Sequence, residues 1–197
     1  MTTVKRICQY LQGNIYTGLV FNTPKTLVTN CFADADFAGL WGDENPQDPI
    51  YAGSRTVFVV TFSNFPLLWV SKQQIDISIS TLHYEYVALS HSVKSLLPLK
   101  SLIKEEIDNL GIDSEKLKFV SSSTIYEDNN WAIVVERVPR MTPTSKHIAF
   151  NYHWFRKHVG KDFMIWKIEP KNQKTVILTK GLQSVLFVRI SNLLYGW

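Results

Sequence analysis

The order of strand-like and helical runs is the feature that most constrains the fold of this chain. Strand-like runs come first, a long amphipathic helix follows, and helices then alternate with strands. Neighbouring strands in a meander favour antiparallel pairing, whereas strands separated by helices favour parallel pairing. The order therefore predicts an α/β domain with a mixed sheet, antiparallel first and parallel afterwards, flanked by helices.

The individual elements are predicted from apolar periodicity, turn residues and helix stop signals. The predicted strands are Tyr16–Phe21, Leu27–Ala33, Arg55–Phe62, Leu67–Ser71, Ile75–Ile79, Leu117–Tyr126 and Phe163–Ile168. The predicted helices are 2–12, a long helix beginning at Ser80 or Thr81, Leu99–Leu110, Asn130–Glu136, His147–Val159 and Gly181–Leu194. Pro98 is expected to break or kink the long helix, because proline lacks a backbone N–H.

The composition is that of one folded domain of ordinary size. Of 197 residues, 45% are hydrophobic and 19% are charged, which excludes a disordered chain. Lysine and arginine total 21, aspartate and glutamate total 17, and the net charge is +4. This excess is compatible with a polyanionic partner such as nucleic acid, and equally with an ordinary solvated basic surface.

The two cysteines and the apolar runs bear on location. Neither Cys8 nor Cys31 stands at a spacing typical of a metal site, so both are expected to be reduced in an intracellular protein, cytoplasmic or nuclear. No apolar run reaches the ~18 residues of a membrane span, and the N-terminus lacks the apolar core of a signal peptide. No membrane partner is expected.

Acidic residues stand where predicted strands end. Asp34 and Asp36 follow one strand, Asp128 follows another, and Glu85 lies on or beside the apolar stripe of the long helix. A charged carboxylate pointing toward a sheet is costly unless paired, and a divalent cation shared by these acids would remove that cost. Carboxylates are ligands that Mg²⁺ prefers, and two ions ~4 Å apart can cleave a phosphodiester. The alternative is that Asp34, Glu85 and Asp128 are three ordinary surface acids, with Glu85 at the edge of the stripe.

Short sequence blocks in a fixed order carry a family resemblance. Phe32–Gly39 resembles Tyr-x-Asp-Ala-Asp-x-Ala-Gly, Trp69–Gln74 matches Trp-x-Ser-Lys-x-Gln, and Ser80–Ala88 resembles Ser-Thr-x-x-x-Glu-Tyr-x-Ala. Further matching blocks are Ser54–Thr56, Tyr126–Asn130, Ser145–Ile148, Tyr152–Arg156 and Thr179–Leu182. Together these blocks resemble the RNase H-like domain of a copia-type LTR retrotransposon Pol polyprotein.

That resemblance implies a five-stranded RNase H-like sheet and Mg²⁺-dependent endonuclease hydrolysis of the RNA strand of an RNA/DNA hybrid. It implies that Asp34, Glu85 and Asp128 are the catalytic, metal-binding acids, with Asp36 a neighbour and two Mg²⁺ ions in the family. His147 also belongs to the motif, although a histidine at a helix start is the plainer interpretation. Residues 1–24 resemble the tail of the reverse transcriptase or connection region, and 25–197 the RNase H-like domain. The implied partners are an RNA/DNA hybrid and the reverse transcriptase region of the same polyprotein.

The chain departs from the family where the fourth acid is expected. The family ends in Ala-Asp-x-x-Thr-Lys, and Val176 stands at the position of the aspartate. Valine offers no lone pair to a metal ion, so the second ion is in doubt and activity should be weakened. Glu169 is the nearest upstream acid that would compensate, but it is expected at the far end of the preceding strand. Trp131 either intrudes on the substrate groove or packs on a neighbouring helix.

Basic and aromatic residues suggest a nucleic-acid surface less specifically. The candidate phosphate contacts are Lys72, Lys146, Arg156 and Lys180, with Arg140 and Lys157 as further possibilities. Trp69 and Trp154 are expected in the core instead of stacking on bases.

The sequence leaves three functions open. The first is a weakened RNase H-type endonuclease, and the alternative is a catalytically inactive nucleic-acid-binding remnant of the polyprotein. The third is a decayed, poorly folded transposon remnant.

Overall fold

The structure, a computed structural model, describes residues 2–21, 26–36, 53–74, 81–112, 118–129, 154 and 157–196. Its strands are β1 (Thr26–Asp36), β2 (Arg55–Phe62), β3 (Phe65–Gln73), β4 (Lys118–Glu127) and β5 (Phe163–Lys167). Its helices are α1 (Thr2–Gly13), α2 (Thr81–Asn109), the 3₁₀ turn η3 (Pro170–Asn172), α5 (Val176–Thr179) and α6 (Ser184–Tyr195).

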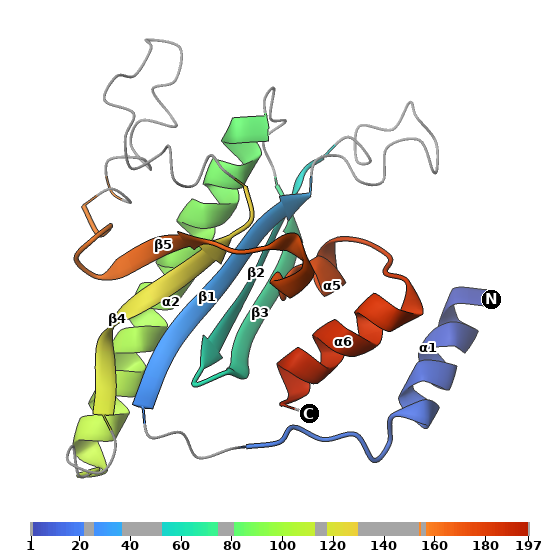
Figure 1. Cartoon of the computed structure of the whole chain (residues 1–197), viewed down its shortest axis with the longest axis horizontal. Coiled ribbons are helices and arrows are strands. Elements are labelled where there is room, and N and C mark those ends of the chain that lie inside the picture. Colours follow the sequence, from blue (N-terminus) through green and yellow to red (C-terminus); the bar gives the residue numbers. More distant parts are fainter. Residues whose placement is uncertain are drawn as a thin grey trace.

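The five strands form one mixed sheet in the order β3-β2-β1-β4-β5 (Figure 1). The pairs β1–β2 and β2–β3 are antiparallel, whereas β1–β4 and β4–β5 are parallel. The predicted RNase H-like arrangement, an antiparallel meander followed by parallel strands, is therefore confirmed. β1 lies at the centre, with neighbours on both sides.

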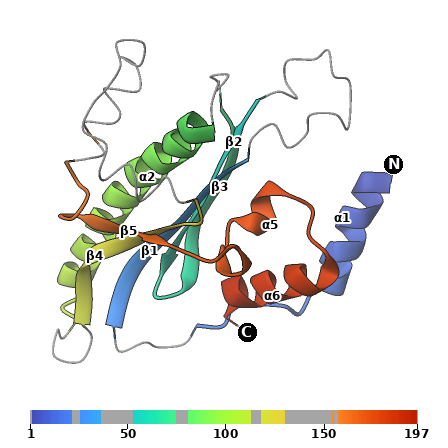
Figure 2. The ribbon, with the colours of Figure 1, turned by 45° about the horizontal axis from the view of Figure 1, so that its top comes forward.

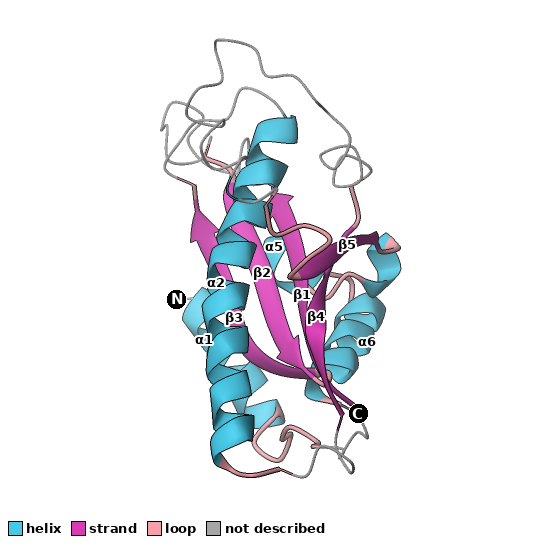
Figure 3. Ribbon diagram, turned by 90° about the vertical axis from the view of Figure 1, so that its left-hand side faces the viewer, coloured by secondary structure: helices cyan, strands magenta, loops and turns pink. Residues whose placement is uncertain are grey.

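Helix α2 covers one face of the sheet, as Figure 3 shows. Its apolar stripe, which includes Leu89, Val93 and Leu96, is buried against alternate residues of the strands. The strands contribute Cys31, Ala33, Phe58, Val60, Ile125 and Phe163 to this core. Because side chains alternate along a strand, the residues of β1 that face α2 alternate with residues that face the opposite side of the sheet.

The other face of the sheet carries α5 and α6 (Figure 3), and α1 lies beside α6 (Figure 2). The ring of Tyr10 in α1 meets the ring of Phe187 in α6 edge to face, with centroids 6.0 Å apart. α1 thus joins the rest of the described chain through α6. No helix among the described residues is long and apolar enough to span a membrane.

The predicted strand Tyr16–Phe21 is wrong. Residues 14–16 form a turn and 17–21 pair with no strand, while the backbone N–H of Val20 donates to the carbonyl of Tyr195 at 2.8 Å. β1 already has β2 and β4 on its two sides, so the sheet centre offers this segment no free edge. Its apolar residues contact neighbouring side chains instead, as where Phe21 meets Phe65 with ring centroids 4.7 Å apart.

The predicted break at Pro98 is also wrong, because α2 runs through this residue without interruption. Pro98 itself is exposed. Leu96 before it is buried, and Leu97 and Leu99 on either side pack on the same core. Burial on both sides of the proline holds the helix together despite the missing hydrogen bond.

The remaining predictions divide between the described and undescribed residues. Ile75–Ile79, Asn130–Glu136 and most of His147–Val159 lie outside the described residues, and at the end of the last range 157–158 form a turn and not a helix. The final helix begins at Ser184, three residues later than predicted, and the short helix α5 was not predicted.

Candidate metal centre

Three carboxylates meet at the end of the sheet where the parallel strands finish. Asp34 lies near the end of β1, Glu127 is the last residue of β4, and Glu85 lies in the second turn of α2. Figure 1 shows that the ends of β1 and β4 and the start of α2 occupy the same end of the molecule. One carboxylate oxygen from each of the three residues lies within 4.8 Å of the others.

Two of these carboxylates are buried, and each has a hydrogen-bond partner among the described residues for only one of its two oxygens. Glu85 is 8% exposed and Glu127 is 0% exposed. Asn129 bridges them: its side-chain amide donates to Glu85 Oε1 at 3.3 Å, and its backbone N–H donates to Glu127 Oε1 at 3.4 Å. Glu85 Oε2 and Glu127 Oε2 have no hydrogen-bond partner within the part of the chain that the structure describes. A bound cation would satisfy buried oxygens of this kind.

Burial and mutual repulsion make these acids hard to ionise. Burial, chiefly, and then the negative charge of Asp128 raise the pKa of Asp34 to about 7. Burial raises the pKa of Glu85 to about 8, against a lowering effect of its hydrogen bond from Asn129. Burial and then the charge of Glu85 raise the pKa of Glu127 well above its ordinary value. At neutral pH the cluster therefore needs either protons or a cation.

The predicted trio of Asp34, Glu85 and Asp128 is brought together only in part. Asp128 follows β4 directly, yet it is not among the carboxylates within 4.8 Å of one another. Its charge still raises the pKa values of Asp34 and Glu85, so it lies in the same electrostatic environment. Asp36, the expected neighbour, ends β1 and also raises the pKa of Asp34. The assignment of Asp128 as a ligand stays a prediction.

The segment with the missing acid lies against β1. The side-chain amide of Gln173 donates to the carbonyl of Ala33 at 2.8 Å, and Lys174 Nζ lies 5.0 Å from the ring centroid of Phe32. Val176 then begins α5 as a buried apolar residue. Farther along, the charge of Lys180 lowers the pKa of Asp34. The apolar residue thus stands in a segment that adjoins the acidic cluster.

Glu169 lies away from the acidic cluster, so it does not replace the acid that is missing at Val176. It lies at the start of η3 beyond β5, is exposed, and pairs with Lys171. Its hydrogen bond and charge interaction with Lys171 lower its pKa. Its carboxylate is also absent from the group that meets around Asp34.

Two of the predicted phosphate contacts are exposed on the described surface near this end. Lys72 is on β3, opposite Thr56 of β2, which itself lies opposite Ala35 of β1. The sheet register therefore places Lys72 level with the acidic cluster, two strands away. Lys180 follows α5 and acts on Asp34 by charge. Lys157 is exposed in a turn farther along, while Arg140, Lys146, Arg156, Trp131 and His147 lie outside the described residues.

The two tryptophan predictions have opposite outcomes. Trp154 is partly buried and packs on the main core, as expected. Trp69 is 62% exposed, so its prediction as a core residue is wrong. It points away from α2 because Leu68 and Val70, its neighbours on β3, pack on the α2 side.

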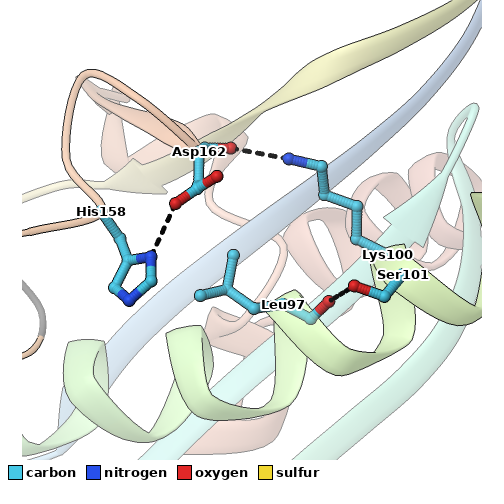
Figure 4. A network of polar contacts seen from close by, with 5 residues as sticks. All are labelled: Leu97, Lys100, Ser101, His158 and Asp162. Carbon is cyan, nitrogen blue, oxygen red and sulfur yellow. Dashed lines mark hydrogen bonds and ion pairs between the residues drawn. The ribbon is translucent and has the colours of Figure 1, made fainter.

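A separate polar network fixes β5 beside α2 (Figure 4). Lys100 Nζ donates to the carbonyl of Asp162 at 2.9 Å, and the Asp162 carboxylate meets His158 Nδ1 at 2.6 Å. Burial lowers the pKa of Lys100, and the charge of Asp162 opposes this effect. These contacts join α2 to the turn before β5, away from the acidic cluster, so their role is structural.

Comparison with known proteins supports the resemblance seen in the sequence. No family model matches the chain. The chain is 29% identical over 178 residues, 90% of its length, to the retrovirus-related Pol polyprotein from transposon TNT 1-94 of Nicotiana tabacum. It is 29% identical over 189 residues, 95% of its length, to the corresponding polyprotein from transposon RE2 of Arabidopsis thaliana. The chain is thus similar to retrotransposon Pol polyproteins over most of its own length. It spans about 12% of the length of these relatives.

Solved structures of RNase H domains are also similar to this chain. The N-terminal RNase H domain of a Mycobacterium tuberculosis protein has a TM-score of 0.47 at 10% identity, covering 84% of this chain and 97% of that chain. LC11-RNase H1, solved in complex with an RNA/DNA hybrid, has a TM-score of 0.45 at 12% identity, covering 74% and 88% of the respective chains.

Glu127 is the residue of this acidic cluster that the sequence did not predict. The predicted strand ended at Tyr126, which left Glu127 between the strand and the expected ligand Asp128. A weak signal is nevertheless present in the sequence, because the apolar Ile125 stands two residues before Glu127. Period two continues to Glu127 and predicts that its side chain faces inward.

Proposed function

We propose that this chain is an RNase H-type endonuclease domain that hydrolyses the RNA strand of an RNA/DNA hybrid, weakened by the loss of an acid at Val176. The observation that carries the proposal is the meeting of Asp34 and Glu85, two motif acids from different elements, with their carboxylate oxygens within 4.8 Å. The orphaned oxygen of Glu85 supports the same conclusion, because a cation would satisfy it.

Asp34, Glu85 and Asp128 are the proposed ligands of divalent metal, with Mg²⁺ as the family cofactor. Bound Mg²⁺ would supply charge stabilisation for a displacement at phosphorus and would activate water. Oxygen ligands suit this ion, and the donor set here consists of carboxylates only. Asn129 has a positioning role, since its two hydrogen bonds orient the carboxylates of Glu85 and Glu127.

Phosphate contacts are proposed for the basic residues at the same end of the sheet. Lys72 and Lys180 are exposed there, and Lys146 and Arg156 belong to the same prediction. Such contacts neutralise backbone phosphates without reading sequence, so hybrid binding should weaken as salt concentration rises. Replacing Lys72 and Lys180 by alanine together should lower hybrid affinity and flatten its salt dependence. The reverse transcriptase region of the same polyprotein is the proposed protein partner.

Val176 favours a second candidate, a domain that binds nucleic acid without cleaving it. A buried valine at the start of α5 provides no oxygen for a metal ion or for water. Losing a group that stabilises transition-state charge costs several kcal/mol, so a rate loss on the order of 100-fold or more is expected. This candidate shares the hybrid-binding surface and differs only in turnover.

Hybrid cleavage in the presence of Mg²⁺ or Mn²⁺ separates the two candidates. The endonuclease proposal expects slow cleavage that Asp34→Asn abolishes and that Val176→Asp raises. Asp108→Asn, which changes an exposed aspartate at the far end of α2, is the matched control and should leave cleavage unchanged. Hybrid binding without cleavage in both the natural chain and Val176→Asp would favour the second candidate.

A further inference from the structure

We infer that Glu127 is a metal ligand of this site, coordinating a divalent cation together with Asp34 and Glu85. The inference rests on the proposed function, because it adds a residue to the proposed metal centre. It gives the site a carboxylate that comes from the end of β4, whereas the acid absent at Val176 would have come from α5. Its test uses metal binding itself, so that the two proposals can fail separately.

The burial of Glu127 is the first observation behind this inference. The residue is 0% exposed, and Glu127 Oε2 has no hydrogen-bond partner among the described residues. A buried carboxylate oxygen without a hydrogen-bond partner costs several kcal/mol, and such groups are rare in native proteins. Its other oxygen accepts only one long hydrogen bond, 3.4 Å from the backbone N–H of Asn129. Packing alone therefore does not account for an acid at this position.

The direction of the side chain is the second observation. Carboxylate oxygens of Glu127, Asp34 and Glu85 lie within 4.8 Å of one another, and Glu85 Oε2 is likewise without a partner among the described residues. Ligand oxygens at opposite sides of one ion are about 4.2 Å apart around Mg²⁺ and about 4.8 Å apart around Ca²⁺, twice the metal–oxygen distance. The limit of 4.8 Å equals the span of a Ca²⁺ sphere and slightly exceeds that of Mg²⁺, so a small inward movement of the carboxylates would complete a Mg²⁺ site.

Charge balance agrees with this geometry. With Glu127, the neighbourhood holds four carboxylates, because Asp128 acts by charge on the other three. Glu127 adds a fourth negative charge to a neighbourhood that would otherwise hold three, which favours the binding of divalent cations. The Glu127 carboxylate therefore supplies the charge that Val176 does not.

Mn²⁺ binding to the whole chain, measured by electron paramagnetic resonance and calorimetry, tests the inference without any substrate. Glu127→Gln keeps the size of the side chain and one acceptor oxygen, and it removes the charge. We expect it to weaken Mn²⁺ binding by on the order of tenfold or more. Glu106→Gln, the same change on the exposed surface of α2, is the matched control and should bind as the natural chain does.

The outcomes distinguish this inference from the proposed function. If Glu127→Gln binds Mn²⁺ as tightly as the natural chain and Asp34→Asn does not bind it, the role of Glu127 is overturned and the proposed metal centre stands. Natural affinity in Asp34→Asn as well, or no Mn²⁺ binding by the natural chain, would overturn both. Should Glu127→Gln fail to fold, Glu127→Asp keeps the charge on a shorter side chain. Unchanged affinity in that variant would also contradict the inference.

Discussion

The side chain of Gln173 donates a hydrogen bond of 2.8 Å to the backbone carbonyl of Ala33, one residue before Asp34. β1 pairs with β4 only as far as Phe32, so Gln173 contacts β1 just past the point where that pairing ends. The contact joins the segment before α5 to the central strand. Gln173 is 1% exposed, and the hydrogen bond is therefore shielded from water.

Replacing Gln173 by methionine should destabilise the chain. The substitution keeps the length of the side chain but removes the donor, which costs about 1–2 kcal/mol when a buried carbonyl loses its partner. Urea denaturation measures the change in the free energy of unfolding. Gln183→Met is the control, because Gln183 is exposed and makes no side-chain hydrogen bond at the start of α6. Equal losses in the two variants would contradict the importance of the contact with Ala33.

The meeting of Asp34 and Glu85 was predictable from the sequence because both positions follow from simple periodicity. Asp34 comes after an apolar strand, and Glu85 borders the apolar stripe of a helix that must cover the sheet. Arg55–Phe62 was predicted with its observed bounds, since a β-branched run between polar turns leaves little ambiguity. The local sequence pattern was sufficient where the position of a residue depended on a single strand or helix.

Glu127 and α5 were not predictable in the same way, because both depend on contacts between distant segments. The predicted strand ends at Tyr126, one residue before the observed end of β4, so Asp128 and not Glu127 is the acid expected at the metal site. Neighbouring strand residues point to opposite faces, so this difference of one residue selects the other side chain. Helix α5 is only Val176–Thr179, too short for a periodic signal, and it contacts β1 close to the hydrogen bond between Gln173 and Ala33. At Pro98, tertiary packing overrode a local signal that would break an isolated helix.

The stability of the metal-free protein should fall as pH rises from about 5 to about 8. The pKa of Asp34 is raised to about 7 and that of Glu85 to about 8 in the fold, whereas both acids release their protons near pH 4 when unfolded. The native state then holds more protons than the unfolded state across this interval, so its stability declines with rising pH. Urea midpoints measured in EDTA at pH 5 and pH 8 give the size of the decline.

Added Mg²⁺ or Mn²⁺ should remove most of this decline, because a bound cation stabilises the ionised carboxylates. Asp34→Asn should have a flatter pH profile in EDTA and a smaller response to the ion. A metal-free protein that became more stable between pH 5 and pH 8 would contradict the raised pKa values of the cluster.

Lys174→Met should raise the free energy of unfolding at pH 7 by about 2–3 kcal/mol. Lys174 is 6% exposed, and burial lowers its pKa to about 8 from an ordinary 10.5. Below pH 8 the fold must hold a buried charge, and this cost is relieved as pH rises from about 8 to 10.5, because the native state releases its proton first. Losing the contact between Lys174 and the Phe32 ring offsets part of the gain.

The same variant should also lose the increase in stability that the natural chain gains above pH 8. Chemical denaturation at pH 7 and pH 9.5 measures both effects. Lys161→Met, at an exposed lysine in the turn before β5, serves as the control and should change neither. A destabilised Lys174→Met at pH 7 would indicate that the ammonium group makes a favourable contact that outweighs its burial.

Pro98→Ala should stabilise the chain by about 1–3 kcal/mol, because α2 carries this proline in its interior. The proline has no N–H for the carbonyl of Lys94, one turn earlier, and its ring crowds that carbonyl. Since Pro98 is exposed, replacing it leaves no cavity in the core. Thermal and urea denaturation measure the gain. The control is Lys104→Ala, which exchanges one good helix former for another at an exposed position of α2 and should leave the stability nearly unchanged. If Pro98→Ala were no more stable than the natural chain, the helix would already have adjusted to the proline through its packing on the sheet.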